Sequence, residues 1–195
     1  MKRVRKYILS VAPFLLGVIF LCDSFAPVPK DDGIKWTLNT QLTVQDFLGK
    51  PISNSQHSAE SFIGISSSCT PMNDSVIIEI DAVFHRNKSW IKKNNDTSRV
   101  IPHEQGHFDL GEVFARKLRK ELSEHKFKKK NLTKYVNETV GYYNGLLTKE
   151  QDVYDTETNH SINEAKQKEW LDKIKKELTE LDAYSSPIIK KQLKG

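Results

Sequence analysis

The spacing of apolar residues changes near residue 98, and this change limits the folds that the chain can adopt. Over Val76–Phe84 apolar residues alternate with polar ones, which predicts a strand with one buried face. Shorter extended segments are expected at 34–38, 42–47 and 61–66. Beyond residue 98 the repeat is helical. Strands followed by helices indicate an α+β fold, with a small antiparallel or mixed sheet packed against helices.

Three helices are expected in the second half of the chain. The first runs from Ser98, which can cap it, to about Lys126, with Pro102 near its first turn. The second follows the apolar positions of 132–147. The third opens with a capping box, Ser161-Ile-Asn-Glu164, and its buried side is expected to include Ile162.

The N-terminal segment has a composition unlike the rest of the chain. Four basic residues within 1–6 precede an apolar run, and Ser24-Phe25-Ala26 follows as a small-x-small pattern. This order predicts a secretory signal, or an N-terminal membrane anchor if it is not cleaved. We therefore expect an exported protein (periplasmic, secreted or envelope-anchored), with a domain at 27–183 and a C-terminal tail at 184–195.

The charge argues against a nucleic-acid-binding protein, and the cysteines argue against a disulfide-bonded domain. Of the net charge of +5, the segment 1–26 contributes +3, so the expected domain is only weakly basic. The cluster at 126–130 has no accompanying aromatic nucleic-acid motif, and no nucleic-acid partner is expected. Cys69 is the one cysteine beyond the predicted signal, which rules out an internal disulfide in the domain.

The pentapeptide His103-Glu104-Gln105-Gly106-His107 is the main candidate for chemistry. On a helix, residues four apart share a face, so His103 and His107 can bind one metal ion. Glu104 can then act as a general base toward water activated by the ion. The H-E-x-x-H motif thus supplies two metal ligands and a general base, and it predicts a Zn²⁺ site. Gly106 lowers helix propensity and therefore needs a structural reason.

A catalytic zinc site needs a third protein ligand. The metzincin pattern would place glycine at 110 and histidine at 113, but the chain has Leu110 and Val113, which excludes that class. The remaining candidates are downstream, in the order His160, Asp155 and Glu138. His160 is ranked first because it precedes the expected Ser161 cap on a short loop that is free to turn toward the first helix.

Three further residues are candidates for supporting roles. Asp109 and Asp155 can accept the free N–H of a ligand histidine and so set its tautomer. Tyr154 can help to stabilise an oxyanion.

Several blocks of the chain, in order, resemble a bacterial family of secreted zinc-dependent proteases of the zincin class. They are Asp46-Phe-Leu-Gly49, Ser89-Trp90, His103-Glu-Gln-Gly-His-Phe-Asp109 and the set Tyr154, Asp155, Thr158, His160, Gln167 and Trp170. The chain departs from the family at Ser161, where glycine is usual, and at Pro102 before the first histidine. The resemblance implies a zincin-like domain and supports the zinc site more than any particular substrate.

The expected function is therefore an exported zinc metallopeptidase that hydrolyses a protein or peptide substrate, with Glu104 as general base. An extended substrate would pair with the strand at 76–84 or with a neighbouring strand. The alternative is a non-catalytic zinc-binding or interaction protein of the bacterial envelope. Retention of Glu104 favours catalysis, because a purely structural site has no use for a base.

Overall fold

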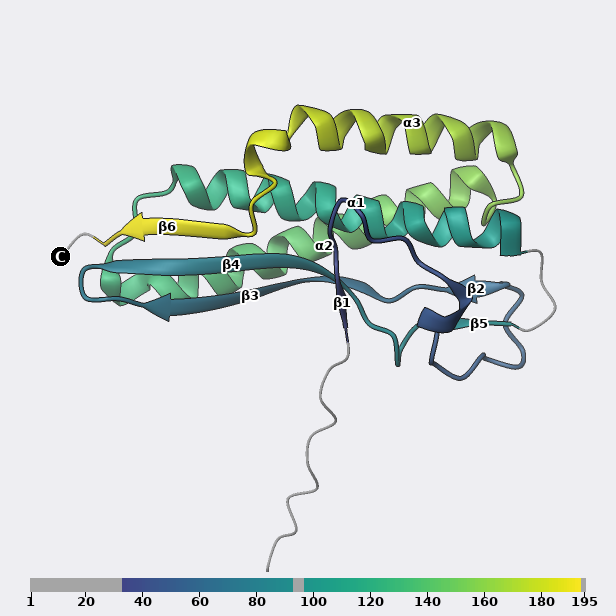
Figure 1. Cartoon of the computed structure of the whole chain (residues 1–195), viewed down its shortest axis with the longest axis horizontal. Helices are drawn as coiled ribbons and strands as arrows, with labels where there is room; N and C mark the ends of the chain where they lie inside the picture. The colour runs from purple at the N-terminus through teal and green to yellow at the C-terminus, as the bar shows by residue number, and fades with distance from the viewer. Residues whose placement is uncertain (1–32, 93–96, 194–195) are drawn as a thin grey trace, which may run out of the picture. The chain divides into compact units, whose positions relative to one another are not determined.

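A computed structural model describes residues 33–92 and 97–193, so the predicted signal at 1–26 lies outside the described residues. The chain divides into two units, 1–30 and 31–195, and the second holds all the elements discussed below. It has small antiparallel sheets and three long helices, which confirms the predicted α+β class (Figure 1). No helix in the described part of the chain is long and apolar enough to cross a membrane.

Strand β4, Ser75–Phe84, is the centre of the main sheet. Strand β3, Ile63–Pro71, pairs with it antiparallel from Ile63 opposite Phe84 to Pro71 opposite Val76. The other edge of β4 is shared between β6, Ile188–Gln192, and β1, Ile34–Lys35. A separate two-stranded sheet joins β2, Ala59–Glu60, to β5, Trp90–Ile91.

The alternation predicted for 76–84 is observed in β4. Its core-facing residues are buried and pack with the apolar side of the first helix, and they are Val76, Ile78, Ile80, Ala82 and Phe84. Asp81, on the other face, pairs with Lys35 of β1 at 2.8 Å. A period of two therefore identified both the strand and its buried face.

Helix α1, Thr97–Glu124, is the element around which the other parts assemble. It packs on β4 and also contacts α2, Leu132–Thr158, and α3, Glu164–Glu180 (Figure 1). Short 3₁₀ turns lie at 44–46, 129–131 and 182–184. Because α1 is covered on several sides, polar groups along it are removed from water and need partners within the protein.

Three local predictions are corrected by the structure. Residues 42–47 do not form a strand; Val44–Asp46 is a 3₁₀ turn, closed by hydrogen bonds from Thr43 to the Asp46 carboxylate. Helix α3 is capped by Asn163, whose side chain accepts from the Lys166 N–H, rather than by Ser161. Ile162 precedes this cap and is exposed instead of buried.

The segment 184–195 was predicted to be a C-terminal tail, but its described part, residues 184–193, contains a strand of the main sheet, which corrects this prediction. Within it β6 pairs with β4 from Glu79 opposite Ile188 to Ser75 opposite Gln192. Ile189, within β6, has its side chain buried in the core. The segment is short and rich in lysine, so its strand character depends on the free edge of β4, which local sequence does not reveal.

The C-terminal half of α1 carries a buried ion-pair network. Glu112, which is 1% exposed, accepts from Arg116 Nε at 2.9 Å and from Arg119 Nη1 at 2.7 Å. Arg119 also donates to the carbonyl oxygen of Ile80 on β4, and Arg116 donates to that of Leu178 on α3. The network thus ties α1 to the sheet and to α3, and its two arginines face two carboxylates, because Arg116 also lies 3.7 Å from Asp182.

Candidate metal centre

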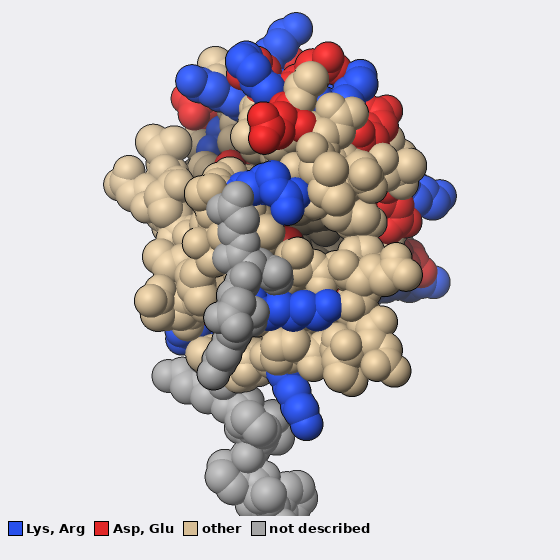
Figure 2. Space-filling view, turned by 90° about the vertical axis from the view of Figure 1, so that its right-hand side faces the viewer, with Lys and Arg blue, Asp and Glu red and all other residues tan. Residues whose placement is uncertain are grey.

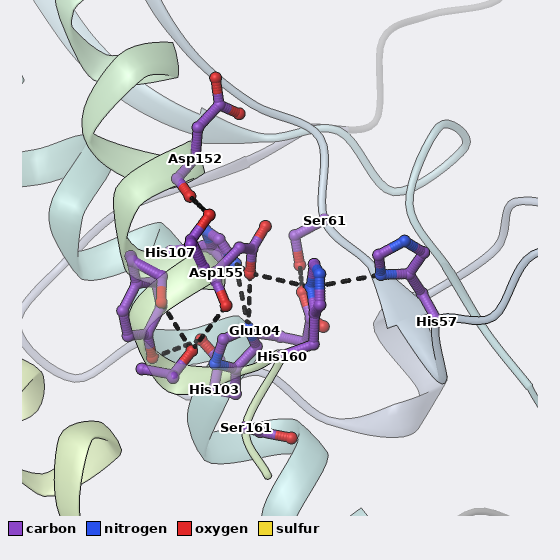
Figure 3. A network of polar contacts seen from close by, with 12 residues as sticks. His57, Ser61, His103, Glu104, His107, Asp152, Asp155, His160 and Ser161 are labelled. Carbon is purple, nitrogen blue, oxygen red and sulfur yellow. Dashed lines mark hydrogen bonds and ion pairs between the residues drawn. The ribbon is translucent and has the colours of Figure 1, made fainter. Parts of the chain in front are cut away.

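Two histidines of α1 and one aspartate of α2 converge on a single point (Figure 3). Oδ1 of Asp155 lies 2.9 Å from Nε2 of His103 and 3.0 Å from Nε2 of His107. The two Nε2 atoms are 3.3 Å apart. Among the described residues this is the group of three metal-ligating side chains whose donor atoms lie close together, and it can hold a metal ion.

Helix geometry accounts for the convergence. His103 and His107 are four residues apart and therefore occupy one face of α1. Asp155 lies in the last turn of α2, which continues beyond the predicted 132–147 as far as Thr158. Asn159 then adopts a left-handed conformation with φ 48°, and its N–H caps the helix. The helix end therefore determines which carboxylate faces the histidines.

The tautomer of neutral His103 is selected by a closed circuit of hydrogen bonds. Gln167 of α3 donates from Nε2 to the Tyr154 hydroxyl, which donates in turn to the backbone carbonyl of His103. The Gln167 amide oxygen is then the acceptor for His103 Nδ1, at 2.8 Å. Because Nδ1 carries the proton in neutral imidazole, Nε2 presents its lone pair to the cluster.

The cluster consequently holds an excess of electron pairs. The lone pair of His103 and the carboxylate oxygen of Asp155 face each other at 2.9 Å, beside a second buried imidazole. Such an arrangement requires a cation, either protons on the rings or a metal ion. The need for a cation is the main chemical property of the site.

The pKa shifts of His107 and Asp155 also indicate that the cluster favours a positive charge beside the carboxylate. Burial opposes the charged form of His107, but the hydrogen bond to Asp155 and the nearby charge of Glu104 outweigh it and raise the pKa of the ring. Burial likewise disfavours ionised Asp155, yet hydrogen bonds from both histidines, in the metal-free form in which their Nε2 atoms carry protons, hold its pKa well below the usual range. Each group stabilises the charge of the other.

Nδ1 of His107 is the unsatisfied atom of the site. It is buried and has no well-aligned hydrogen-bond partner in the described part of the chain. The Gln151 side chain is close enough to contribute to the raised pKa of this ring, although it is not aligned for a good hydrogen bond. The ring is therefore less firmly oriented than that of His103.

Glu104 lies beside the cluster without belonging to it. Its side chain is almost fully buried, and the Ser61 hydroxyl donates to its Oε2 at 2.5 Å. In the described structure no lysine or arginine pairs with it. A buried carboxylate that lacks a cationic partner is costly, and such groups are concentrated at functional sites.

The cluster opens into a pocket of about 600 Å³. One wall is the continuous segment 57–64, and the facing wall is formed by α2 from Asn144 to Asp155. His103, Glu104 and His107 of α1 also line it. Figure 2 views the molecule from the right-hand side of Figure 1, and the hollow on this face is surrounded mainly by uncharged residues. The reactive groups thus line a pocket that is open to solvent.

The structure does not bring His160, ranked first as the third ligand, into the group of converging atoms. Its Nδ1 lies 3.4 Å from Asp155 Oδ1 and 3.2 Å from Nδ1 of His57, at the pocket rim (Figure 3). Burial is the main cause of a lowered pKa of this ring. Asp155, ranked second, takes the predicted position. Glu138, ranked third, is exposed near Lys134, almost five turns earlier on α2.

The backbone explains why His160 is displaced. Asn159, His160 and Ser161 all have positive φ, at 48°, 49° and 73°. The turn directs His160 sideways to His57 rather than into the cluster. Ser161 is held in this conformation with its hydroxyl accepting from Arg99 at 2.8 Å. A φ of 73° lies in the left-handed region, which favours glycine.

Gly106 has the structural reason that its low helix propensity demanded. A β-carbon at this position would lie 2.3 Å from the Tyr154 hydroxyl oxygen and 3.2 Å from Leu171. The glycine therefore lets α2 and α3 approach α1 closely. The same close approach places Tyr154 and Gln167 where they can orient His103.

Two supporting roles expected from the sequence are not observed. Asp109 accepts from Trp36 Nε1 and from Gln105, both at 2.8 Å, so it anchors the residue that follows β1 instead of a ligand histidine. Tyr154 is fully buried beneath His103, and burial raises the pKa of its hydroxyl. It orients the site from below and is not placed to contact an oxyanion in the pocket.

Three residues that face the site were not identified from the sequence as site residues. They are His57, Ser61 and Asn144. His57 lies in a stretch without regular periodicity, Ser61 begins the predicted extended segment 61–66 without belonging to a motif, and Asn144 belongs to the polar side of a helix. Gln167 was named in the sequence analysis only as part of the set of residues that resembles the zincin family, with no role assigned. Its position as a polar residue on the inner side of α3 was the feature that could have indicated one.

No protein-family model, curated protein or solved structure matches this chain.

Proposed function

We propose that the protein is a zinc-dependent metallopeptidase. The observation that carries the proposal is the group of His103 Nε2, His107 Nε2 and Asp155 Oδ1, mutually separated by 2.9–3.3 Å, beside Glu104. Ligand atoms around a tetrahedral zinc at about 2.0–2.1 Å are about 3.3 Å apart, so these separations need little adjustment. Two imidazoles and a carboxylate are also a common zinc ligand set.

When bound, a zinc ion acidifies water and polarises a carbonyl group. The protein groups then have separate tasks. Glu104 accepts a proton and passes it to the leaving amine, and Ser61 holds its carboxylate in place at 2.5 Å. Gln167 keeps the proton of His103 on Nδ1, so that Nε2 stays available to the ion.

An extended peptide is the substrate that best suits the walls of the pocket. Strand β4 is paired on both edges and is closed to a further strand. Strand β3 has only β4 beside it in the sheet, and its Ile63 and Gly64 line the pocket. Substrate pairing is therefore assigned to β3, the neighbouring strand, through its backbone groups.

The rival function is a non-catalytic zinc site in an interaction protein. A structural zinc site normally has four protein ligands, whereas three converge here within the described residues. The buried Glu104 has no cationic partner in the described structure, which costs stability and favours a catalytic use. The resembling sequence blocks and the basic-then-apolar N-terminus add export to the proposal.

The first test is metal content. We expect purified wild-type protein to hold about one zinc per chain by elemental analysis. His103→Ala and Asp155→Ala should lose it, whereas His160→Ala and Asp152→Ala should retain it. Asp152 is a matched control because it lines the same pocket from the same helix. Folded wild-type protein that binds no zinc would reject the proposal, and loss of zinc only in His160→Ala would reassign the third ligand.

The second test separates catalysis from metal binding. Glu104→Gln should retain zinc and lose peptide hydrolysis by about a hundredfold or more, because it removes only the proton acceptor. Ser61→Ala should reduce hydrolysis less, since the carboxylate remains. Hydrolysis that survives in Glu104→Gln would favour the non-catalytic alternative with a contaminating activity.

A further inference from the structure

The outer edge of β3 presents backbone groups at alternate residues. The His85 N–H donates to the Phe62 carbonyl at 2.9 Å, so Phe62 turns its backbone toward the β4 side. Ile65, of opposite parity, makes both of its backbone hydrogen bonds to the side chain of Asn144 on α2. Since backbone groups alternate between the two sides of a strand, Ile63 also presents its N–H and C=O to the outer edge.

Both walls of the pocket end at the same place along this edge. The β-wall includes each residue from His57 to Gly64, and among the described residues it extends no farther along β3. The α2 wall runs from Asp155 back to Asn144 and stops there. Ile63 is therefore open to the pocket, while Ile65, one repeat farther on, is not part of it.

Asn144 closes this end of the groove by replacing a strand. Its Nδ2 donates to the Ile65 carbonyl at 3.0 Å, and its Oδ1 accepts from the Ile65 N–H at 2.8 Å. A third bond, from Nδ2 to the Val140 carbonyl at 3.1 Å, ties the amide to its own helix. The side-chain amide thus makes the pair of hydrogen bonds that a peptide group of an added strand would make.

We propose that Asn144 is a length-determining residue, which restricts the site to peptide bonds near a chain end. This inference rests on the proposed function. Ser61 contacts Glu104, so the position of the reacting groups along the edge is known. From Ser61 to Gly64 the edge spans three residues, or about 10 Å. An extended chain can pair with Ile63 and must end or leave the edge about three residues from the cleaved bond.

The experiment uses zinc-loaded full-length protein and a tryptic digest of casein as the probe, with cleavage positions read by mass spectrometry. Wild type should cut bonds within about three residues of one chain end about tenfold faster than internal bonds, as expected for one or two backbone hydrogen bonds. In Asn144→Ala this preference should disappear. Thr148→Ala is the matched control, because Thr148 lines the same wall one turn away and bonds only to its own helix.

Each outcome is decisive. Indifference of wild type to chain ends, or an end preference that persists in folded Asn144→Ala, overturns the inference. If Asn144→Ala unfolds, Asn144→Ser replaces it, since serine can bond the Val140 carbonyl as Thr148 bonds that of Asn144. If no peptide is cut, the proposed function fails separately, and amide hydrogen exchange with the same digest decides. If the digest slows amide exchange at Ile63 in both proteins, and slows it beyond Ile65 only in the variant, Asn144 limits the length of the paired peptide. If the digest leaves exchange at Ile63 unchanged, the inference is rejected.

Discussion

The two halves of helix α1 both bury charged and polar side chains, but they do so with opposite results. Toward its C-terminus, Glu112 is matched by Arg116 and Arg119, and the arginines also bond backbone carbonyls of β4 and α3. Toward its N-terminus, His103, Glu104 and His107 face another carboxylate across a pocket. In one half the charges are paired within the protein, whereas in the other the described residues place no lysine or arginine beside the carboxylates and the group can hold a metal ion.

The difference shows how a buried polar cluster can be recognised as a site. Burial alone does not distinguish the two halves, since Glu104 is 4% exposed and Glu112 is 1% exposed. The distinguishing property is whether lone pairs and charges are satisfied within the protein. A satisfied network stabilises the fold, whereas an unsatisfied one beside a pocket is poised for a ligand.

Removal of a charge from the half whose charges are paired should have the largest effect. Arg119→Met leaves Glu112 buried with only Arg116 and frees the carbonyl oxygen of Ile80. We expect a loss of about 3–5 kcal/mol in the free energy of unfolding, measured by denaturant titration. Zinc bound per folded molecule should not change. A loss of zinc in the folded variant would show that the two halves are coupled.

The close approach of α2 to α1 should be the next most sensitive feature. Gly106→Ala places a methyl group against Tyr154 and should cost about 1–3 kcal/mol of stability. It should also weaken zinc binding, because Tyr154 and Gln167 orient His103. The control is Gly141→Ala, a helical position with open space around it, where a gain of about 0.5–1 kcal/mol is expected. Equal effects at both positions would contradict the packing argument.

The pH dependence of the metal-free protein tests the pairing of His107 with Asp155. The raised pKa of His107 contributes stability that is present below about pH 6.5 and is lost as pH rises through the folded value. The lowered pKa of Asp155 contributes stability present above about pH 3.9 and lost as pH falls through its folded value. Thermal unfolding of wild type and Asp155→Asn should therefore differ most between about pH 4 and 6.5, by about 1–2 kcal/mol. A difference that keeps growing above pH 7 would oppose this pairing.

The smallest effect is expected from neutralising Glu104, and neutralising Glu112 provides the contrast. At alkaline pH, where His107 is neutral, Glu104→Gln should leave the stability of metal-free protein unchanged or raise it by about 1 kcal/mol, because no lysine or arginine of the described residues pairs with this carboxylate. Glu112→Gln should lower it, since two arginines then lose their counter-ion. Chemical denaturation of both variants in the presence of a chelator makes the comparison. Destabilisation of similar size by both would remove the distinction between the halves.

The sequence by itself determined the features that depend on neighbours along the chain. The period of two at 76–84 identified β4 and its buried face, and the spacing of His103 and His107 put both rings on one side of a helix. The glycine at 106 was marked as a position that needed a reason. These features follow from local geometry, which is the same in any fold.

Only the tertiary structure decided which groups meet those histidines. Asp155 rather than His160 faces them because α2 extends to Thr158 and three residues with positive φ then turn His160 aside. Ser61 and Gln167 reach the site from 43 and 64 residues away. The strand β6 likewise exists because β4 has a free edge to pair with. Such contacts depend on how elements pack, and no local pattern encodes the partner.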